Sequence, residues 1–320
     1  EGAYAIEHLL RDFLSWEPIL PFDRRGRIKL KDFAKLLAPL CRMLRENVEE
    51  ALKDPESPLV QLAEEWRQLL FPDADDKRFA DAYAQTVTFA LLLGRSEGAE
   101  PLSVKTAVEA LDVSHSLLSR ALEILTDRRI REEIEAPLSL LERVIGAVPP
   151  QRFLAQEDPW LYFYEDFLAV YDPKLRKDAG IYYTPVEVVQ AQVQLIEDIL
   201  RNHLGKDLGF IDPEVVILDP AVGTGTYLLG VIKKAMERVK ETQGKGAIPG
   251  QASELAKRLY GFEIMVGPYA VAELRVSRAL KDYGANLPKD GAQIYLTDTL
   301  EDPETHPKQL PFYYQPIAEQ

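Results

Sequence analysis

The feature that most constrains the fold is a short segment with two glycines, Asp219–Thr226, which follows a run of branched apolar residues. Residues 215–218 read Val-Val-Ile-Leu, a composition typical of a strand that is buried on both faces. Gly223 and Gly225 lie one residue apart after this run, and a stretch compatible with a helix begins at Tyr227. Glycines between a strand and a helix let the main chain come very close to a ligand. The segment therefore predicts a strand, a ligand-binding loop and a helix, in that order.

The chain after residue 184 alternates between helix and strand patterns. In chain order it predicts a helix over 185–203, a strand over 215–218, a helix over 227–240, a short helix over 253–258, a strand over 259–263, a helix over 270–281 and a strand over 292–296. Residues 244–250 are expected to form a flexible loop. Thr184, Pro185 and Glu187 have the spacing of a capping box with a proline at the first helical position. The alternation is typical of a parallel, doubly wound sheet.

The first 150 residues predict helices alone. Apolar residues recur at steps of three and four along five stretches, over residues 33–52, 59–69, 79–91, 117–125 and 138–148. Pro39 lies inside the first stretch, so we expect that helix to be kinked or to begin near this proline. Cys41, the single cysteine, lies among these apolar positions and is expected to be a buried packing residue.

A pair of prolines separates this helical part from the rest of the chain. The segment Val148–Gln151 contains Pro-Pro, which cannot continue a helix, and it predicts a boundary between a helical domain over 1–150 and a second domain over 151–320. Residues 160–171 carry aromatic and apolar side chains at helical spacing and predict one more helix, leading into the second domain. The expected fold class is α/β, with an all-helical N-terminal domain before a partial Rossmann-like domain built on a parallel, doubly wound sheet.

Composition and charge narrow the classes of protein further. The chain has 52 acidic and 38 basic residues, a net charge of -14 and a pI near 4.9. This balance argues against free-standing, sequence-independent DNA binding, because phosphate contacts need local Lys and Arg, but it allows a module whose DNA-gripping parts lie elsewhere. The basic cluster over residues 24–31 lacks interleaved aromatic residues and is expected to be a solvated face rather than a DNA contact.

Targeting and metal signals are weak throughout the sequence. No apolar run approaches the roughly 18 residues that span a bilayer, and the first residues lack the pattern of a secretory signal, so no membrane partner is expected. A single cysteine fits the reducing cytoplasm, which is the expected location. The four histidines are scattered without metal-ligand spacing, so no metal site is expected.

Three carboxylates are expected to meet at the carboxyl edge of the sheet. Asp219, Glu263 and Asp298 each lie at or just past the end of an expected strand, and in a parallel sheet these ends share one edge. A P-loop is excluded because no lysine follows Gly225, and the dinucleotide fingerprint requires a small residue where Leu228 stands. Three carboxylates would also repel a pyrophosphate. They suit a ligand with a cationic centre, a ribose diol and an adenine amino group, which is the chemistry of S-adenosylmethionine.

Four short segments between residues 180 and 300 resemble the motifs of a known family. Residues 180–300 resemble the amino-methyltransferases that modify adenine N6 in DNA, as found in type I methylation subunits and in single-chain type ISP or IIG restriction-modification enzymes. Gly180–Pro185 resembles the family's motif X, Asp219–Tyr227 motif I, Gly261–Ile264 motif II and Thr297–Leu300 motif III. The resemblance implies that the second domain is an S-adenosylmethionine-dependent methyltransferase domain.

The resemblance also implies roles at the methionine end of the cofactor. Thr184 and the neighbouring backbone would meet the methionine, and Asp219 would interact with its amine, directly or through water. Gly223 and Gly225 would let the main chain approach the ribose and the methionine. Tyr182 and Tyr183 belong to the same motif, although the pair can equally pack the helix against the sheet.

At the nucleoside end the resemblance implies that Glu263 accepts both ribose hydroxyls. Ile264 would pack against the adenine ring, and Asp298 would accept the hydrogens of its amino group. Glu263 and Asp298 would each be read as an ordinary solvated carboxylate if met alone, but both are in register with motif I. The complete set of expected cofactor-binding residues is Tyr182, Tyr183, Thr184, Asp219, Pro220, Ala221, Gly223, Gly225, Thr226, Glu263, Ile264 and Asp298.

The sequence departs from the family at the catalytic motif. Asn/Asp-Pro-Pro-Tyr/Phe, which holds and stacks the flipped adenine in such enzymes, does not occur between residues 1 and 320. The Asp-Pro pairs at 158, 172 and 302 have one proline each and lie in the wrong place. No catalytic residue is therefore expected in this chain, which should bind cofactor without methylating. The motif, the remaining strands and a target-recognition domain are expected beyond Gln320.

Partners and alternatives follow from the same resemblance. The intact protein is expected to act on duplex DNA through regions mostly outside this chain, with fused or associated nuclease, helicase and target-recognition domains. The helical domain resembles the region that couples the methylase to such parts in large single-chain restriction-modification proteins. Two other readings stay open, a methyltransferase of protein or small molecules and a non-catalytic cofactor-binding or scaffolding module.

Overall fold

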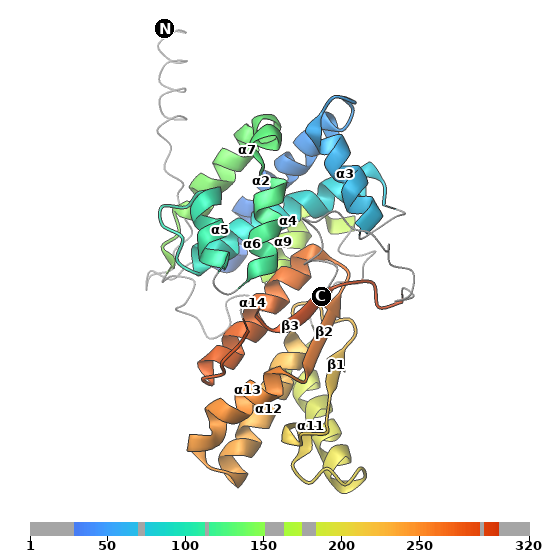
Figure 1. Cartoon of the computed structure of the whole chain (residues 1–320), viewed down its shortest axis with the longest axis vertical. Coiled ribbons are helices and arrows are strands. Elements are labelled where there is room, and N and C mark those ends of the chain that lie inside the picture. The colour runs from blue at the N-terminus through green and yellow to red at the C-terminus, as the bar shows by residue number, and fades with distance from the viewer. Residues whose placement is uncertain are drawn as a thin grey trace.

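The computed structural model describes residues 29–69, 74–112, 115–150, 163–174, 184–288 and 291–300. Figure 1 shows a layer of helices at one end and a small sheet with its own helices at the other. The helical layer contains α2 (Leu30–Ala51), α3 (Pro58–Leu69), α4 (Asp76–Ser96), α5 (Val104–Asp112), α6 (Ser116–Leu125), α7 (Arg128–Gly146) and α9 (Phe163–Tyr171). The sheet part contains α11 (Val186–Asn202), β1 (Ile217–Asp219), α12 (Thr226–Thr242), α13 (Ile248–Ala256), β2 (Leu259–Glu263), α14 (Val266–Asp282) and β3 (Gln293–Leu296), with 3-10 turns over Gly209–Ile211 and Lys245–Ala247.

The helical layer is built around α4, which is buried on all sides from Tyr83 to Ser96. It contacts α2, α5, α6 and α7. Cys41 of α2 is buried as expected, and burial raises the pKa of its thiol to about 12, which marks an unreactive packing residue. Helix α9 packs on α2 and α4, with the Phe167 and Phe89 rings 5.2 Å apart in an edge-on contact. The division of the chain at residue 150 stays a prediction.

The sheet has the order β1-β2-β3 with all strands parallel, so the expected α/β class and parallel sheet are confirmed. Asp219 pairs with Gly261, and Glu263 pairs with Leu296. Helix α12 follows β1 and helix α14 follows β2, and these two helices pack on each other. The carboxyl ends of the strands consequently share one edge.

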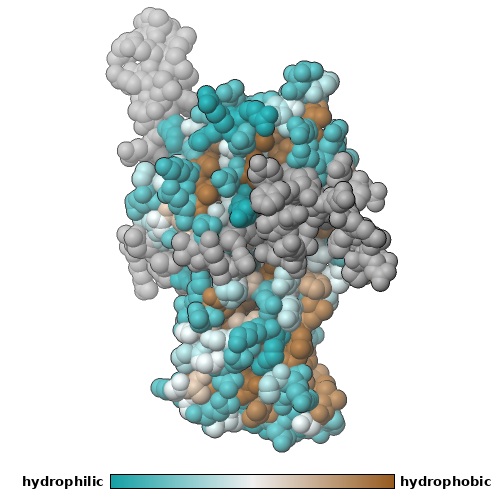
Figure 2. All heavy atoms as spheres, in the orientation of Figure 1, coloured by the Kyte–Doolittle hydropathy of each residue, from teal (hydrophilic) through white to brown (hydrophobic). Residues whose placement is uncertain are grey.

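Strand β1 is less buried than its composition predicts. Among the described residues it pairs only with β2, and Leu218 and Val216 have 49% and 65% of their surface exposed. The expected strand over 215–218 is also displaced, because Val215 closes a turn by donating its N–H to the Asp212 carbonyl. Exposed apolar residues likewise lie along α11, and Figure 2 shows hydrophobic residues gathered where Figure 1 places β1 and α11.

Several local predictions are corrected by the structure. Residues 244–250 are not a flexible loop, because a 3-10 turn leads into α13, whose first turn carries Pro249 in a position that suits its fixed φ. The capping box at Thr184 does not form, since Pro185 itself takes the N-cap position and no side chain caps α11. Helix α2 begins well before Pro39 and continues through this exposed proline. Helix α5 was not expected at all.

Helix α14 lies between the two layers, as Figure 1 shows, and is buried from Val266 to Ser277. It contacts α4 and α9 of the helical layer as well as β2, β3 and α12. At Gly267 the approach is so close that a Cβ atom would lie 2.4 Å from the Tyr164 ring and 2.5 Å from Gln85 Oε1. Glycine is therefore required there by space. None of the described helices has the length and apolar content needed to cross a bilayer.

Replacing this glycine tests the junction between the layers. Gly267→Ala should lower the free energy of unfolding by about 1–3 kcal/mol, the usual cost of overpacking a filled core. Gly246→Ala is the matched control, because a Cβ at Gly246 would meet nothing within 4 Å. Urea unfolding of the three proteins measures the difference, and equal midpoints for Gly267→Ala and the control would contradict the close packing.

Candidate functional site

The structure brings the ends of β1 and β2 together with the glycine loop. Glu263 sits at the end of β2 with 9% of its surface exposed. Its Oε2 accepts a hydrogen bond from the Gly223 N–H at 2.9 Å, and its Oε1 accepts one from the Met265 N–H at 2.8 Å. At the end of β1, Asp219 Oδ1 accepts from the Ala221 N–H at 3.2 Å. Two carboxylates thus face the segment that the sequence marks as a ligand-binding loop.

Burial disfavours the charged form of both carboxylates and so raises their pKa values. Burial raises the pKa of Asp219, although the hydrogen bond from Ala221 partly opposes this. Burial also raises the pKa of Glu263, with a further rise from the charge of Asp219 and an opposing effect of the backbone N–H donors. In addition, Asp219 Oδ2 is buried and has no hydrogen-bond partner among the described residues. An unsatisfied buried oxygen costs free energy, which a donor or cation on a ligand would recover.

The two glycines of the loop serve different structural needs. Both have a left-handed backbone, with φ +56° at Gly223 and +85° at Gly225. A Cβ at Gly223 would meet nothing within 4 Å, so this side of the loop is open. A Cβ at Gly225 would lie 3.1 Å from Val276 and 3.5 Å from the backbone of Ala272, both on α14. Gly223 therefore leaves room at the loop, whereas Gly225 allows the loop to pack on α14.

Arg275 of α14 holds the loop from its inner side, and the sequence did not mark it. The side chain is almost completely buried. Its Nη1 donates to the carbonyl oxygen of Thr224, donates to Thr224 Oγ1 at 2.9 Å, and lies 3.4 Å from Thr226 Oγ1. The pattern of α14 gives no signal for this role, because only the fold brings the loop over the helix.

The segment after β3 is tied to the other two strand ends. Thr297 donates its N–H to the Glu263 carbonyl at 2.9 Å, and Thr299 Oγ1 donates to the Pro220 carbonyl at 2.6 Å. Asp298 uses Oδ1 to accept from the Leu300 N–H at 2.9 Å. The third carboxylate therefore follows the third strand as expected, in a segment that contacts the glycine loop directly.

Apolar and polar surfaces flank these carboxylates. Ile264, next to Glu263, keeps 38% of its surface exposed, which is high for a large apolar side chain. A groove of about 430 Å³ lies between α11 and α12, and its lining includes Thr226 and Arg275 but none of the three carboxylates. The groove consequently opens beside the loop and not over the acidic edge.

Thr184 is half-buried before α11, while Tyr182 and Tyr183 lie outside the described residues.

The chain matches a family model and several solved structures. Residues 156–313 match the family described as N-6 DNA Methylase. A cryoEM structure of a DrdV–DNA complex is 21% identical, with a TM-score of 0.66 over 98% of this chain and 29% of that chain. The ATP-dependent Type ISP restriction-modification enzyme LlaBIII bound to DNA is 21% identical, with a TM-score of 0.62 over 91% of this chain and 19% of that chain.

A nuclease-deletion mutant of the Type ISP enzyme LlaGI, in complex with a DNA substrate mimic, is 20% identical, with a TM-score of 0.60 over 92% of this chain and 23% of that chain. This chain thus spans less than a third of the length of each of these three structures. Comparison with curated proteins finds no match. The structural likeness concerns the fold, and it covers both the helical layer and the sheet. Residues 156–313, just under half of the chain, thus resemble the N-6 DNA methylase family.

Proposed function

We propose that the carboxyl edge of the sheet binds S-adenosylmethionine and that the intact protein transfers its methyl group to N6 of adenine in DNA. The observation that carries the proposal is that a half-buried carboxylate, Asp219, and a buried one, Glu263, lie beside an open glycine loop within the residues that match this family. A cytoplasmic setting remains part of the proposal.

The methionine end of the cofactor would lie beside Asp219, whose Oδ2 has no hydrogen-bond partner among the described residues. Its ammonium and sulfonium groups are cationic and would offset the desolvation that raises the pKa of Asp219 and Glu263. The ammonium would donate to Asp219 Oδ2, which lacks a partner among the described residues. The open side of Gly223 leaves space for the ligand against the main chain.

The nucleoside end fits the neighbouring residues. Each oxygen of Glu263 accepts one backbone N–H, and a carboxylate oxygen has a second lone pair with which to accept a ribose hydroxyl. The exposed side chain of Ile264 would be covered by the adenine ring. Asp298 would accept from the adenine amino group with the oxygen that Leu300 does not use.

The bound cofactor supplies an electrophilic methyl group, and the residues of this chain bind and orient it. Orientation is itself a large part of the acceleration, because in-line attack needs the reacting atoms at a fixed separation. The flipped adenine requires acceptors for its amino hydrogens, and the tetrapeptide that provides them in such enzymes is absent from residues 1–320. Methyl transfer is therefore assigned to the intact protein and cofactor binding to this chain.

DNA is the proposed partner of the intact protein. The similar structures are complexes with DNA or with a DNA substrate mimic, and this chain spans a minor part of each. The net charge of -14 fits a cofactor-binding module better than a surface that grips phosphates. The proposal therefore places most of the DNA contacts, together with nuclease, helicase and target-recognition functions, in other domains.

Replacing Glu263 tests the cofactor assignment directly. Glu263→Ala should weaken binding of S-adenosylmethionine at least tenfold, because a hydrogen bond to a charged group contributes about 1.5–3 kcal/mol and tenfold corresponds to about 1.4 kcal/mol. Calorimetric titration measures the affinity. Glu254→Ala, which removes an exposed carboxylate of α13, is the control for net charge, and NAD is the control for ligand. Unchanged affinity in Glu263→Ala, or no binding by a folded wild-type chain, would sink the assignment.

A pair of glycines tests whether the loop faces the ligand. Gly223 and Gly205 both have positive φ and open space where a Cβ would lie, so alanine at either should cost about 1–2 kcal/mol of stability. Only Gly223→Ala should also weaken S-adenosylmethionine binding by roughly tenfold or more, because its methyl group would occupy the open side of the loop. Thermal unfolding and calorimetric titration give the two quantities. Equal affinities for the two variants would place the ligand elsewhere.

A further inference from the structure

Helix α14 carries three buried polar residues at every second position. Glu273, Arg275 and Ser277 have 2%, 4% and 1% of their surface exposed. Polar groups at such depth are stable only with partners. The partners of these three lie in different parts of the chain, so α14 connects segments that are distant in the sequence.

Two of the residues form hydrogen bonds with the sheet part. Arg275 donates to the Thr224 carbonyl and to Thr224 Oγ1 in the glycine loop. Ser277 accepts from the N–H of Ala292 at 2.8 Å, just before β3, and donates to Glu273 Oε1 at 2.9 Å. The glycine loop and the start of β3 are therefore both hydrogen-bonded to α14.

The third residue faces the helical layer. Glu273 Oε2 forms an ion pair with Nδ1 of His115, the N-cap residue of α6, and His115 Nε2 lies 3.9 Å from Glu97 Oε1. The charges that act on Glu97 include those of Lys281 and Arg278 of α14. Burial alone would lower the pKa of His115, but the charge of Glu273 and the contacts with both carboxylates outweigh it and raise the pKa to about 9. The imidazole is consequently charged at neutral pH.

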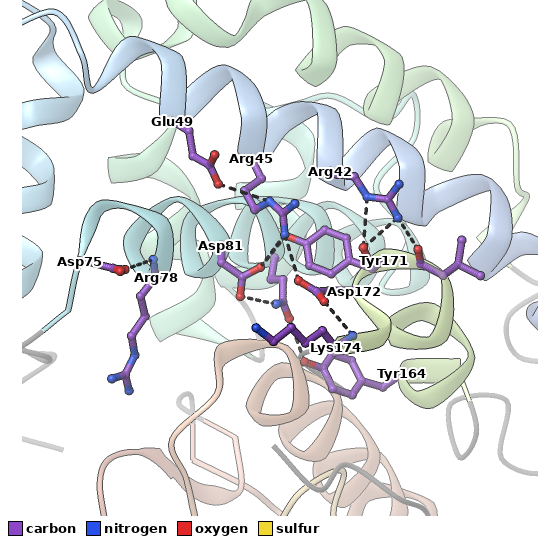
Figure 3. A network of polar contacts seen from close by, with 12 residues as sticks. Arg42, Arg45, Glu49, Asp75, Arg78, Asp81, Tyr164, Tyr171, Asp172 and Lys174 are labelled. Atoms are coloured by element: carbon purple, nitrogen blue, oxygen red, sulfur yellow. Dashed lines mark hydrogen bonds and ion pairs between the residues drawn. The ribbon is translucent and has the colours of Figure 1, made fainter. Parts of the chain in front are cut away.

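The surface on which α14 rests is itself fixed by a polar network, shown in Figure 3. Tyr164 Oη donates to Gln85 Oε1 at 2.9 Å, beneath Gly267 of α14, and Gln85 Nε2 donates to Asp81 Oδ2 at 2.9 Å. Tyr171 Oη donates to the other oxygen of Asp81 at 2.6 Å. Helices α4 and α9 are thereby held together where α14 meets them, so this surface can act as a reference for the position of α14.

We propose that His115 is a positioning residue for the cofactor site, which fixes α14 on the helical layer through Glu273 and thereby holds the glycine loop through Arg275. The helical layer then sets how ordered the loop is before any ligand binds. The effect on cofactor affinity rests on the proposed function, whereas the effect on loop order does not.

The primary test is hydrogen exchange of the loop amides in the full chain without ligand. The amides of Val222, Gly223 and Gly225 are hydrogen-bonded in the structure, to Phe262, Glu263 and Val222, so their exchange reports on loop order. His115→Gln should speed their exchange by roughly tenfold or more, because Glu273 is left buried without its cation. His203→Gln, at an exposed histidine that caps the C-terminus of α11, should leave their exchange unchanged.

A double variant separates positioning from loss of folding. His115→Gln combined with Glu273→Gln replaces the ion pair by a neutral pair and removes the buried charge, so it should fold even if the single variant does not. The wild-type pair contributes fully below pH 6.5, the ordinary pKa of histidine, and its contribution is lost as the pH rises through about 9. Loop exchange corrected for intrinsic rates should therefore rise over this range in the wild type and stay flat in the double variant. The dissociation constant for S-adenosylmethionine should rise in both proteins, because the ligand's own ammonium loses its proton in this range, but it should rise more steeply in the wild type.

The outcomes distinguish the two proposals. Loop exchange that depends on His115 in a chain that binds no S-adenosylmethionine supports the positioning role and overturns the proposed function. Cofactor binding with loop exchange and pH profile identical in the wild type and the double variant overturns the positioning role. If His115→Gln fails to fold, the pH profile of the double variant is sufficient by itself to support or overturn the positioning role.

Discussion

The burial of α14 on both sides is the constraint on which the rest of the structure depends. From Val266 to Ser277 the helix is shielded from solvent by the helical layer and by the sheet part. A charged side chain in such a place must be paired, because an uncompensated buried charge costs several kcal/mol. Glu273 is paired with His115 on one side, and Arg275 is satisfied by the glycine loop on the other. The requirement to satisfy two charges therefore fixes the loop and the helical layer relative to the same helix.

Burial also opposes the charges of the two carboxylates at the edge of the sheet. Burial raises the pKa of Asp219 and of Glu263, so ionisation of both at neutral pH works against the folded state. Glu263 recovers part of that cost from two backbone donors, but Asp219 Oδ2 recovers none from the described residues. A cationic ligand with hydroxyl donors would supply what both groups lack. Under the proposed function, the edge would bind its ligand at some expense of stability, as is usual for functional sites.

The sequence predicts those features that depend on residues close together in the chain. Strand β2 was predicted with its observed bounds, since alternation and composition over five residues decide it. The glycine loop followed from its local context in the same way. The pairing of His115 with Glu273 and the role of Arg275 could not be predicted, because packing brings together residues that are distant in the sequence. The exposure of β1 likewise depends on tertiary structure. Its apolar composition predicts burial, but composition does not show which elements cover the strand, and among the described residues β1 pairs with β2 alone.

The acidity of the edge also bears on how a substrate reaches it. Carboxylates that favour a cationic cofactor repel phosphates, and the net charge of the chain acts in the same direction. For the proposed methylation, a base that leaves the duplex can approach the acidic edge while its backbone stays farther away, where water and salt screen the repulsion. The base is neutral, so the acidic edge does not oppose its entry. Selectivity for a flipped base over the backbone would then be a consequence of the charges that bind the cofactor, and the cations that hold the DNA need not lie near the sheet.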